Sequence, residues 1–324
     1  MRAPLSAAVA GVFALLALAA LLTLGRATRH DTTNPPPVTP HVVARLAPAE
    51  SGGAEAGGFG AVWVQDTTGK QLVRIDARTR RVVARVRVGT SPDIAAGAGA
   101  VWALTGGNGY TVPGPLLAID PGTNRVSARI PLGTPGGEPF SAAGLVAVDG
   151  AVWAFGPDGA IRVDARSHRV TASITVPTRR GNVSSAATDG HSLWLLTDDG
   201  RLFRLDARTG TRLESARVAA GNEIDAADAT GIYVNGSRGI SRVDPASGRE
   251  IWRAGTPGEP QSVLVTRGRV WVAYGGDVIS TYDAATGRGL ATTRLPDFVG
   301  TSLAANGSEV WVLGDNGKVD VVTP

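Results

Sequence analysis

The segment Leu116–Val126, which reads LLAIDPGTNRV, is an apolar stretch that ends on an aspartate and turns through Pro-Gly-Thr. This apolar-Asp-x-x-Thr/Ser pattern recurs along the chain, with successive aspartates 44, 44, 42, 38, 39 and 37 residues apart. An aromatic residue precedes each aspartate. The aspartates are Asp76, Asp120, Asp164, Asp206, Asp244, Asp283 and, in degraded form, Asp320, and the aromatics are Trp63, Trp102, Trp153, Trp194, Tyr233, Trp271 and Trp311. Seven copies of such a unit, rich in Val, Ile and Thr, predict an all-β, seven-bladed β-propeller.

Each repeat divides into four strands. In the second copy we expect residues 94–96 to form the innermost strand, 100–104 the next, 116–120 the third and 126–132 the outer one. Asp-Gly and Asn-Gly pairs between the first and second strands suit a turn with positive φ. The Asp-x-x-Thr/Ser segment joins the third strand to the fourth, because an aspartate carboxylate accepts backbone N–H bonds across such a turn. The repeated aspartates and tryptophans therefore have structural roles in this interpretation.

The outer strand of the last blade is expected to come from the other end of the chain. The sequence ends at Pro324, directly after the third strand of the seventh repeat. Residues 42–46, VVARL, match residues 82–86, VVARV, which belong to the outer strand of the first repeat. We therefore predict that the N-terminal segment pairs with the last blade, which closes the ring and covers strand edges that invite aggregation.

The charge pattern argues against a nucleic-acid-binding protein, although the formal net charge is +4 and the isoelectric point is about 9.9. The arginines are scattered singly along strands, and Lys70 and Lys318 are the only lysines. A nucleic-acid site needs basic residues gathered on one surface, usually with aromatic residues between them. The chain has no cysteine, which excludes disulfides, zinc–thiolate sites and thiol catalysis.

The N-terminal part is predicted to hold the propeller at a membrane. Residues 3–25 carry no charge and are long enough to cross a bilayer, so residues 1–26 form a signal anchor or a signal peptide. Residues 27–41 form a Pro-rich linker, which acts as a stiff spacer, and residues 42–324 form the propeller. Charges flank both ends of the apolar segment, so they hardly decide its orientation. We expect the propeller outside the cytoplasm, on a single-pass anchor or secreted after cleavage.

The repeat resembles that of the YVTN-type propellers, which include YncE-like proteins and overlap with the streptogramin (virginiamycin B) lyase-like propellers. The resemblance rests on Val101–Leu104, Leu116–Val126 and Ile130–Gly133 and covers about residues 42–324. It implies the propeller fold and leaves the activity open. The lyase chemistry is understood to use histidine, glutamate and a divalent metal near the central channel. The histidines are His30, His41, His168 and His191, and none is expected on an innermost strand, so that active site does not transfer.

A second resemblance concerns Ile240–Trp252. This segment is similar to the Asp-x-x-Thr/Ser-Gly-x-x-x-Trp repeat of quinoprotein dehydrogenases, in which the tryptophan recurs around the ring and brackets a quinone and a calcium. Here Trp252 is the one copy with that tryptophan, because the units of Asp206 and Asp283 carry Gly210 and Gly287 without it. The resemblance therefore implies shared packing between blades and no quinone cofactor.

Acidic residues at the innermost strands are the candidate ligand-binding residues. They are Asp93, Glu138, Glu223, Asp225 and Glu259. Asp225 stands out, because the equivalent position holds Leu145, Ala186, Val263 or Leu303 in other repeats. A carboxylate at such a position must be solvated, paired or bound to a cation. Glu223 and Asp225 lie on one strand face and suit a Ca²⁺ or Mg²⁺ ion or a cationic ligand, and the alternative is that these acids line a water-filled funnel.

These observations favour a non-catalytic binding module, in the form of a monomeric propeller that takes a protein or another surface ligand. The enlarged loop from Gly106 to Pro115, with Tyr110 on it, is a second candidate contact for a partner. Two alternatives stay open at this point. One is a metal-dependent lyase or hydrolase with its site in the central funnel, and the other is a nucleic-acid-binding protein of the YncE-like kind.

Overall fold

The structure is a computed structural model that describes residues 39–90, 93–107, 112–176, 182–218, 223–237, 239–296 and 300–324. Within these residues the strands form seven antiparallel sheets of four strands each. Blades 1 to 3 are β2 (Gly52–Gly58), β3 (Ala61–Asp66), β4 (Gln71–Asp76), β5 (Arg81–Arg87); β6 (Asp93–Gly97), β7 (Ala100–Gly107), β8 (Val112–Asp120), β9 (Arg125–Ile130); and β10 (Gly144–Val148), β11 (Ala151–Gly156), β12 (Gly159–Asp164), β13 (Arg169–Thr175).

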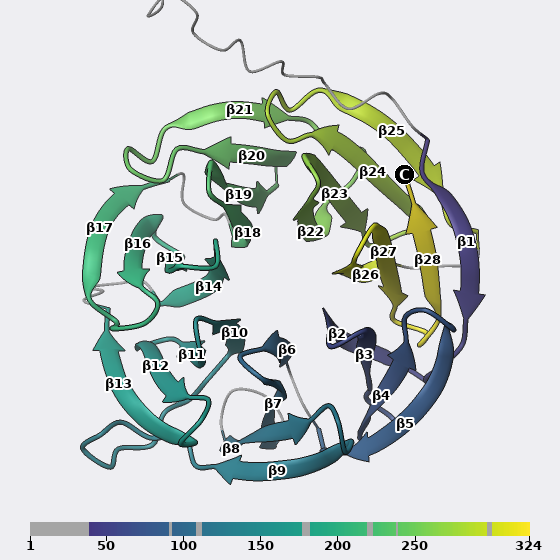
Figure 1. Cartoon of the computed structure of the whole chain (residues 1–324). Coiled ribbons are helices and arrows are strands. Elements are labelled where there is room, and N and C mark those ends of the chain that lie inside the picture. The colour runs from purple at the N-terminus through teal and green to yellow at the C-terminus, as the bar shows by residue number, and fades with distance from the viewer. Residues whose placement is uncertain are drawn as a thin grey trace, which may run out of the picture. The chain divides into compact units, whose positions relative to one another are not determined.

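Blades 4 to 6 are β14 (Val183–Thr188), β15 (Ser192–Thr197), β16 (Arg201–Asp206), β17 (Arg212–Arg217); β18 (Glu223–Asp228), β19 (Gly231–Gly236), β20 (Gly239–Val243), β21 (Glu250–Ala254); and β22 (Pro260–Thr266), β23 (Arg269–Tyr274), β24 (Val278–Asp283), β25 (Gly289–Arg294). Blade 7 is β26 (Gly300–Asn306), β27 (Glu309–Gly314), β28 (Val319–Thr323) and β1 (His41–Leu46). Figure 1 shows the sheets arranged around a central axis with the first strand of each blade innermost. The predicted seven-bladed propeller is confirmed.

The closure of the ring by the N-terminal strand is also confirmed. Strand β1 pairs antiparallel with β28, with Val42 opposite Val322 and Leu46 opposite Val319. The Nε atom of Arg45 lies 3.5 Å from Oδ2 of Asp320, which adds an ion pair across the seam. The last blade is therefore built from both ends of the propeller sequence, which leaves its outer edge no more open than those of the other blades.

The blade aromatics fill the spaces between adjacent sheets, as predicted. The most deeply buried are Trp63, Trp102, Trp153, Trp271, Trp311 and Tyr233. The indole N–H of Trp153 reaches into the next blade and donates to the carbonyl oxygen of Ala207 at 2.9 Å. Some arginines on the third strands take part in this packing, since the guanidinium of Arg74 stacks over Trp63 at 5.3 Å and that of Arg204 over Trp194 at 5.2 Å. The core is a ring of such interfaces rather than one central cluster.

The repeated aspartates close the turns between third and fourth strands. Oδ1 of Asp76 accepts the backbone N–H and the hydroxyl of Thr79, each at 2.7 Å. Asp164 makes the same two contacts with Ser167, at 2.8 and 2.7 Å. These hydrogen bonds lower the pKa of both carboxyls, because they favour the ionised form. The predicted structural role of the aspartates is confirmed at these turns.

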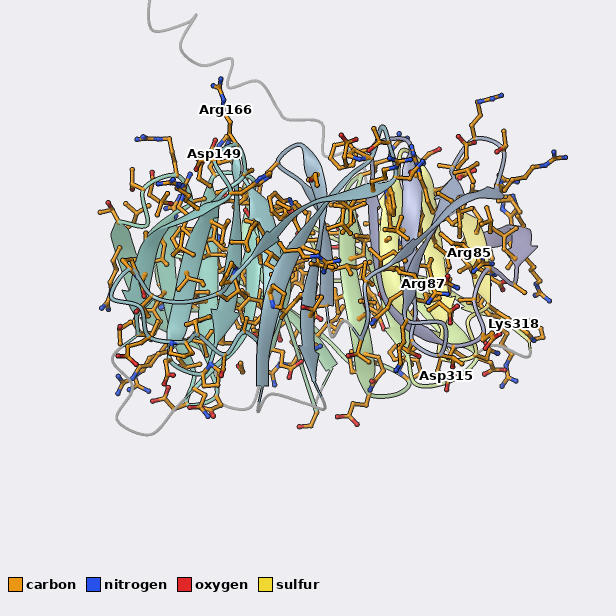
Figure 2. All side chains as sticks on the ribbon, turned by 90° about the horizontal axis from the view of Figure 1, so that it is seen from below. Arg85, Arg87, Asp149, Arg166, Asp315 and Lys318 are labelled. Atoms are coloured by element: carbon orange, nitrogen blue, oxygen red, sulfur yellow. The ribbon has the colours of Figure 1, made fainter. Side chains whose placement is uncertain are left out.

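The propeller has two faces that differ in which turns they carry. The turn face holds the hairpin turns between first and second strands and those between third and fourth strands. The entry face holds the segments that lead into each innermost strand and the turns between second and third strands. Figure 2 shows Asp149 and Arg166 on the turn face and Asp315 and Lys318 on the opposite, entry face.

Blade 2 departs from its expected form. Residues 106–107 and 112–115, expected as parts of a loop, extend the hairpin instead, because β7 and β8 continue pairing as far as Gly107 and Val112. Tyr110 lies outside the described residues. The predicted anchor (residues 1–26) and most of the linker also lie outside them, and within the described part no helix is long and apolar enough to cross a membrane.

Candidate functional site

Asp93 opens the innermost strand of blade 2 and binds blade 3. Its Oδ2 accepts the backbone N–H of Leu145 at 2.7 Å, and its Oδ1 accepts that of Ile94 at 2.8 Å. Burial of the carboxyl raises the pKa of Asp93 to about 6, against the lowering effect of these two hydrogen bonds. The residue as a whole keeps intermediate exposure, so it is the carboxyl group that is desolvated. Asp93 acts here as a link between blades.

Asp225 makes the corresponding link from blade 5 to blade 6. Burial raises the pKa of its carboxyl well above the usual range, and the charge of Glu223 raises it further. The backbone of Val263 and the side chain of Asn235 hydrogen-bond to the carboxylate and lower the pKa in part. Its Oδ2 atom is nevertheless buried without a partner of good hydrogen-bond geometry. Glu223, the first residue of β18, is exposed. Burial of this kind favours the neutral form of the carboxyl group over the charged form.

Ser185 makes a third link of the same kind, between blades 4 and 5. Its hydroxyl oxygen accepts the backbone N–H of Ile224 at 2.8 Å, and both groups are buried. A short polar side chain on one innermost strand thus repeatedly receives an N–H from the next innermost strand. This repetition gives Asp93 and Asp225 a structural function that the sequence did not predict.

Glu55 is a buried acid that sequence reasoning missed. It lies on β2 opposite Val64, and neither carboxylate oxygen has a partner of good hydrogen-bond geometry. Burial raises the pKa of Glu55 well above its usual range, and a hydrogen bond to the backbone of Leu313 in blade 7 lowers it in part. Glu55 precedes Trp63 by eight residues, as Asp225 precedes Tyr233. The comparison of equivalent positions that singled out Asp225 would have found Glu55 had blade 1 been included.

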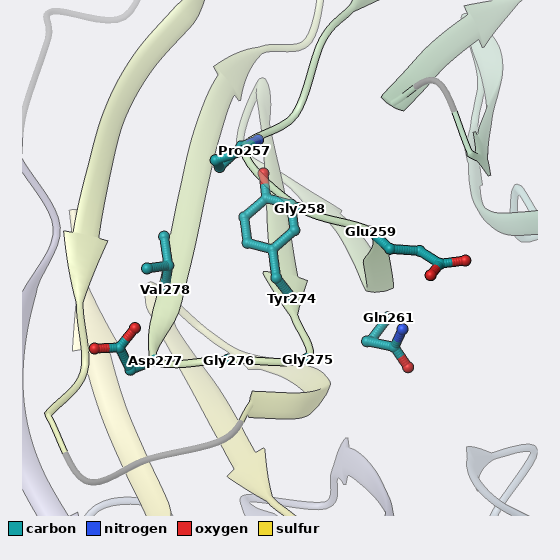
Figure 3. A pocket seen from close by; sticks show the side chains of 9 residues that line it. All are labelled: Pro257, Gly258, Glu259, Gln261, Tyr274, Gly275, Gly276, Asp277 and Val278. Atoms are coloured by element: carbon teal, nitrogen blue, oxygen red, sulfur yellow. The ribbon is translucent and has the colours of Figure 1, made fainter.

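Glu259 is the predicted acid that lies at a cavity. A cavity of about 410 Å³ opens on the entry face of blade 6, between the segment that leads into β22 and the turn from β23 to β24. Glu259 and Gln261 lie on one side of the Gly275–Gly276 backbone and Asp277 on the other (Figure 3). The buried ring of Tyr274 forms a wall, and its hydroxyl group lies 3.2 Å from that of Tyr282.

The chemistry of this cavity is that of a cation-accepting recess. Glu259 and Gln261 are exposed and supply oxygen acceptors, and Asp277 is held 3.4 Å from Arg294 in an exposed ion pair. A Cβ built on Gly276 would meet no atom within 4 Å, so this backbone is open to a ligand. Such a set of groups suits a Lys or Arg side chain or another polar group of a binding partner.

The remaining candidate, Glu138, lies apart from the innermost strands. It is exposed in the loop between β9 and β10, where its backbone pairs with that of Thr134 at 2.8 Å. The five predicted acids therefore do not form one site. Among the described residues no group of three His, Cys, Asp or Glu side chains could hold a metal ion. The ligand-binding role of these acids stays a prediction.

Comparison with known proteins finds a family match in the last blades. Residues 236–323 match the PQQ_2 family model, described as outer membrane protein assembly factor BamB. The match begins at the end of β19. It covers less than a third of the chain, and it includes the Trp252 segment that resembles the quinoprotein repeat. The expected likeness to the YVTN-type and lyase-like propellers stays a prediction. No curated protein matches the sequence.

Solved structures with the same fold are distant in sequence. The β-propeller domain of Cps50 (Swd1) from Myceliophteria thermophila superposes with a TM-score of 0.69 at 13% identity, over 88% of this chain and 99% of that one. BamB from Moraxella catarrhalis gives 0.60 at 14% identity, over 86% and 85%. The computationally designed protein Ika8 gives 0.61 at 13% identity, over 88% and 84%. At such identities the likeness establishes the propeller fold alone.

Proposed function

We propose that this chain is a non-catalytic, protein-binding propeller, held outside a membrane by its N-terminal segment, that docks a basic segment of a partner protein. The observation that carries the proposal is the cavity of about 410 Å³ on the entry face of blade 6. It combines an aromatic wall, an open backbone at Gly276 and acceptor groups on Glu259 and Gln261. Glu223, exposed at the start of β18 in the neighbouring blade, adds a further negative charge to this face.

The family match covers the part of the chain that contains the blade-6 cavity. The match over residues 236–323 contains the whole cavity, from Pro257 to Val278. The matched family is described as an outer membrane protein assembly factor. An assembly factor works by binding other proteins, and a propeller face with a polar recess is suited to that task. We infer that this chain likewise assists the assembly of proteins at a membrane surface.

Site-specific crosslinking tests the proposal, and the absence of native cysteine makes each introduced thiol unique. The full chain carries a photoactivatable group at Gly276→Cys, where a Cβ meets no neighbour within 4 Å. We expect this group to capture a protein through a Lys- or Arg-bearing peptide, identified by mass spectrometry. A second version carries the group at Ala246→Cys, in an exposed turn of the opposite face, and should not capture that peptide.

A charge variant decides whether the cavity itself is responsible. Glu259→Lys should abolish the crosslink from position 276, because it places a cation where the partner's cation would bind. Glu138→Lys changes the net charge equally, at an exposed entry-face residue outside the cavity, and should preserve the crosslink. Equal loss in both variants, or equal capture from positions 276 and 246, would contradict docking at blade 6.

A further inference from the structure

A second cavity lies on the turn face, between blades 2 and 3. It has a volume of about 480 Å³ and is lined by residues of the turns, among them Gly99, Asp120, Gly150, Arg166 and His168. A Cβ built on Gly99 or on Gly150 would meet no atom within 4 Å, so the mouth of the cavity is open there. This cavity is separate from the blade-6 cavity and from the hydrogen-bonded links between innermost strands.

The polar groups of this cavity favour an anion. Arg166 is exposed, and among the described residues no carboxylate lies within ion-pair distance of its guanidinium. The imidazole of His168 packs edge-on against Trp102, with ring centroids 6.1 Å apart, and offers a second nitrogen donor. A guanidinium presents paired donors that match the oxygens of a phosphate.

Three carboxylates lie near these donors and set the limits of the site. One is Asp164 of the same turn, whose Oδ1 atom accepts the backbone N–H and the hydroxyl of Ser167. The Oδ1 atom of Asp120 is engaged by the turn, since it accepts the backbone N–H groups of Gly122 at 2.7 Å and Thr123 at 3.0 Å. Asp149 is exposed beside Gly150 and projects from the same face as Arg166 (Figure 2). Asp149 therefore opposes an anion in the cavity, and its removal should strengthen binding.

Other arginines share the position of Arg166 on this face. Arg78 and Arg208 also stand two residues after the turn aspartate of their own blades, and both are exposed. The aspartates of these turns have their Oδ1 atoms directed into the turn by hydrogen bonds to Thr79 and Thr209. Each of these arginines stands beside the ionised aspartate of its own turn, so the turns carry exposed guanidinium groups without a net positive charge. The guanidinium groups are spread over several blades, and a spread of this kind suits an extended anionic surface better than a single small ligand.

The chain enters the propeller from this same face. His41, the first residue of β1, pairs with Thr323, at the end of β28 that is farthest from the entry-face residue Lys318. Near this point the guanidinium of Arg80, a turn-face residue, donates to the carbonyl oxygen of Val43 at 3.3 Å and pairs with Glu309 at 2.7 Å. The apolar residues 3–25 precede this entry point by the Pro-rich linker, residues 27–41. The linker therefore joins the propeller at the turn-face end of β1.

We propose that the turn face lies against a bilayer that contains anionic phospholipid, and that the cavity between blades 2 and 3 receives the phosphate of a lipid headgroup through Arg166 and His168. The entry face, with the blade-6 cavity, then faces away from the membrane and is accessible to partners. This inference rests on the membrane attachment in the proposed function and is independent of partner docking at blade 6.

Fluorescence quenching by lipid tests this arrangement with the full chain inserted into vesicles. A fluorophore is attached at Ala246→Cys on the turn face or at Asp315→Cys on the entry face, and the quencher is a headgroup-labelled lipid. In vesicles with phosphatidylglycerol we expect strong quenching at position 246 and weak quenching at position 315. In vesicles of phosphatidylcholine alone, quenching at position 246 should fall. Excess inorganic phosphate should not abolish it, which distinguishes a lipid headgroup from a free phosphate.

Matched arginine variants locate the headgroup. The turn face exchanges between a state docked on the bilayer and an undocked state. One basic residue at an anionic surface shifts the equilibrium between these two states by about fivefold. Arg208→Ala should reduce the docked-to-undocked ratio by about that factor, because it removes surface charge alone. Arg166→Ala should reduce the ratio clearly more, since it also removes the donor of the cavity, and Asp149→Asn should raise it.

Several outcomes would overturn the proposal. Equal effects of Arg166→Ala and Arg208→Ala contradict the headgroup cavity, and stronger quenching at position 315 than at position 246 contradicts the orientation. Competition by inorganic phosphate would show a free-phosphate site instead of a lipid site. A chain that does not float with vesicles contradicts the membrane attachment as well, whereas a chain that floats with equal quenching at both positions contradicts this proposal alone.

Discussion

Glu55 and Asp225 occupy the same position in blades 1 and 5, eight residues before the aromatic of their own blade, and both carboxyl groups are desolvated. The other blades place Ile94, Leu145, Ala186, Val263 and Leu303 there. The two acids contact different neighbours, because Glu55 reaches the backbone of Leu313 in blade 7 and Asp225 reaches that of Val263 in blade 6. Ionising either of them at neutral pH opposes folding.

The stability of the propeller should therefore be highest in mild acid. Because the folded pKa of Asp93 is raised from 3.8 to about 6, the stability linked to this group is full below pH 4 and is lost as the pH rises to 6. The loss amounts to about 3 kcal/mol by pH 7. Asp76 and Asp164 have lowered pKa values, so their contribution is lost as the pH falls below 4. Urea unfolding at a series of pH values measures this dependence, and a maximum at pH 8 would contradict it.

Glu55→Gln should stabilise the protein at pH 8 and have little effect at pH 5. The amide has nearly the shape of the carboxyl group and cannot ionise, so it removes the free-energy cost of burying a group that is ionised in the unfolded chain at this pH. The expected gain at pH 8 is about 1–3 kcal/mol. The comparison variant is Glu50→Gln, because Glu50 is exposed, and it should change stability at neither pH. Equal effects of the two variants would mean that Glu55 is solvated.

Gly287→Ala should destabilise the contact between blades 5 and 6. A Cβ at Gly287 would lie 2.6 Å from the ring of Trp252, and this residue has a φ of +71°. The indole of Trp252 also donates to the carbonyl oxygen of Ala284 at 3.1 Å, so the ring cannot move without losing that bond. We expect a loss of about 2–4 kcal/mol from strain and displaced packing.

Gly276→Ala is the matched glycine variant for this experiment. Its added Cβ meets no atom within 4 Å, and the residue does not have a positive φ. Its effect on thermal unfolding should stay within about 0.5 kcal/mol. A loss in Gly276→Ala as large as that in Gly287→Ala would rule out the Trp252 contact as the cause.

Deletion of residues 42–47 should destabilise the whole domain. The deletion removes almost all of β1, which pairs with β28 from Val42 to Leu46, and it exposes the edge of blade 7. We expect a large drop in the melting temperature, together with aggregation. Deletion of residues 27–38 shortens the linker and leaves β1 intact, so its melting temperature should match that of the full chain. An unchanged melting temperature after loss of residues 42–47 would contradict closure by β1.

Most of the fold could be predicted because it repeats. The spacing of the aspartates and aromatics, and the match between residues 42–46 and 82–86, are local patterns that each blade needs for its own turns and strands. The extended hairpin of blade 2 was missed, because Gly-rich segments carry little strand signal and the pairing of Gly107 with Val112 follows from the strands that precede it.

The candidate site was predicted only in part. Asp225 was singled out as unusual and Asp93 was named with it as a candidate ligand, but their hydrogen bonds to Leu145 and Val263 come from neighbouring blades and have no sequence signal. Glu259 was named as an acid near a strand, without the cavity that Tyr274 and Gly276 form with it. Glu138, named on the same grounds, lies in an exposed loop.

The sequence by itself determined the number of blades, the role of the turn aspartates and the closing strand. These features depend on hydrogen bonds and packing between residues of one repeat, or between two segments that match each other. Only the tertiary structure decided which acids lose water, where the two cavities lie and which charges share a face. Those properties depend on how adjacent blades meet around the ring, because desolvation comes from neighbours that are distant in the chain.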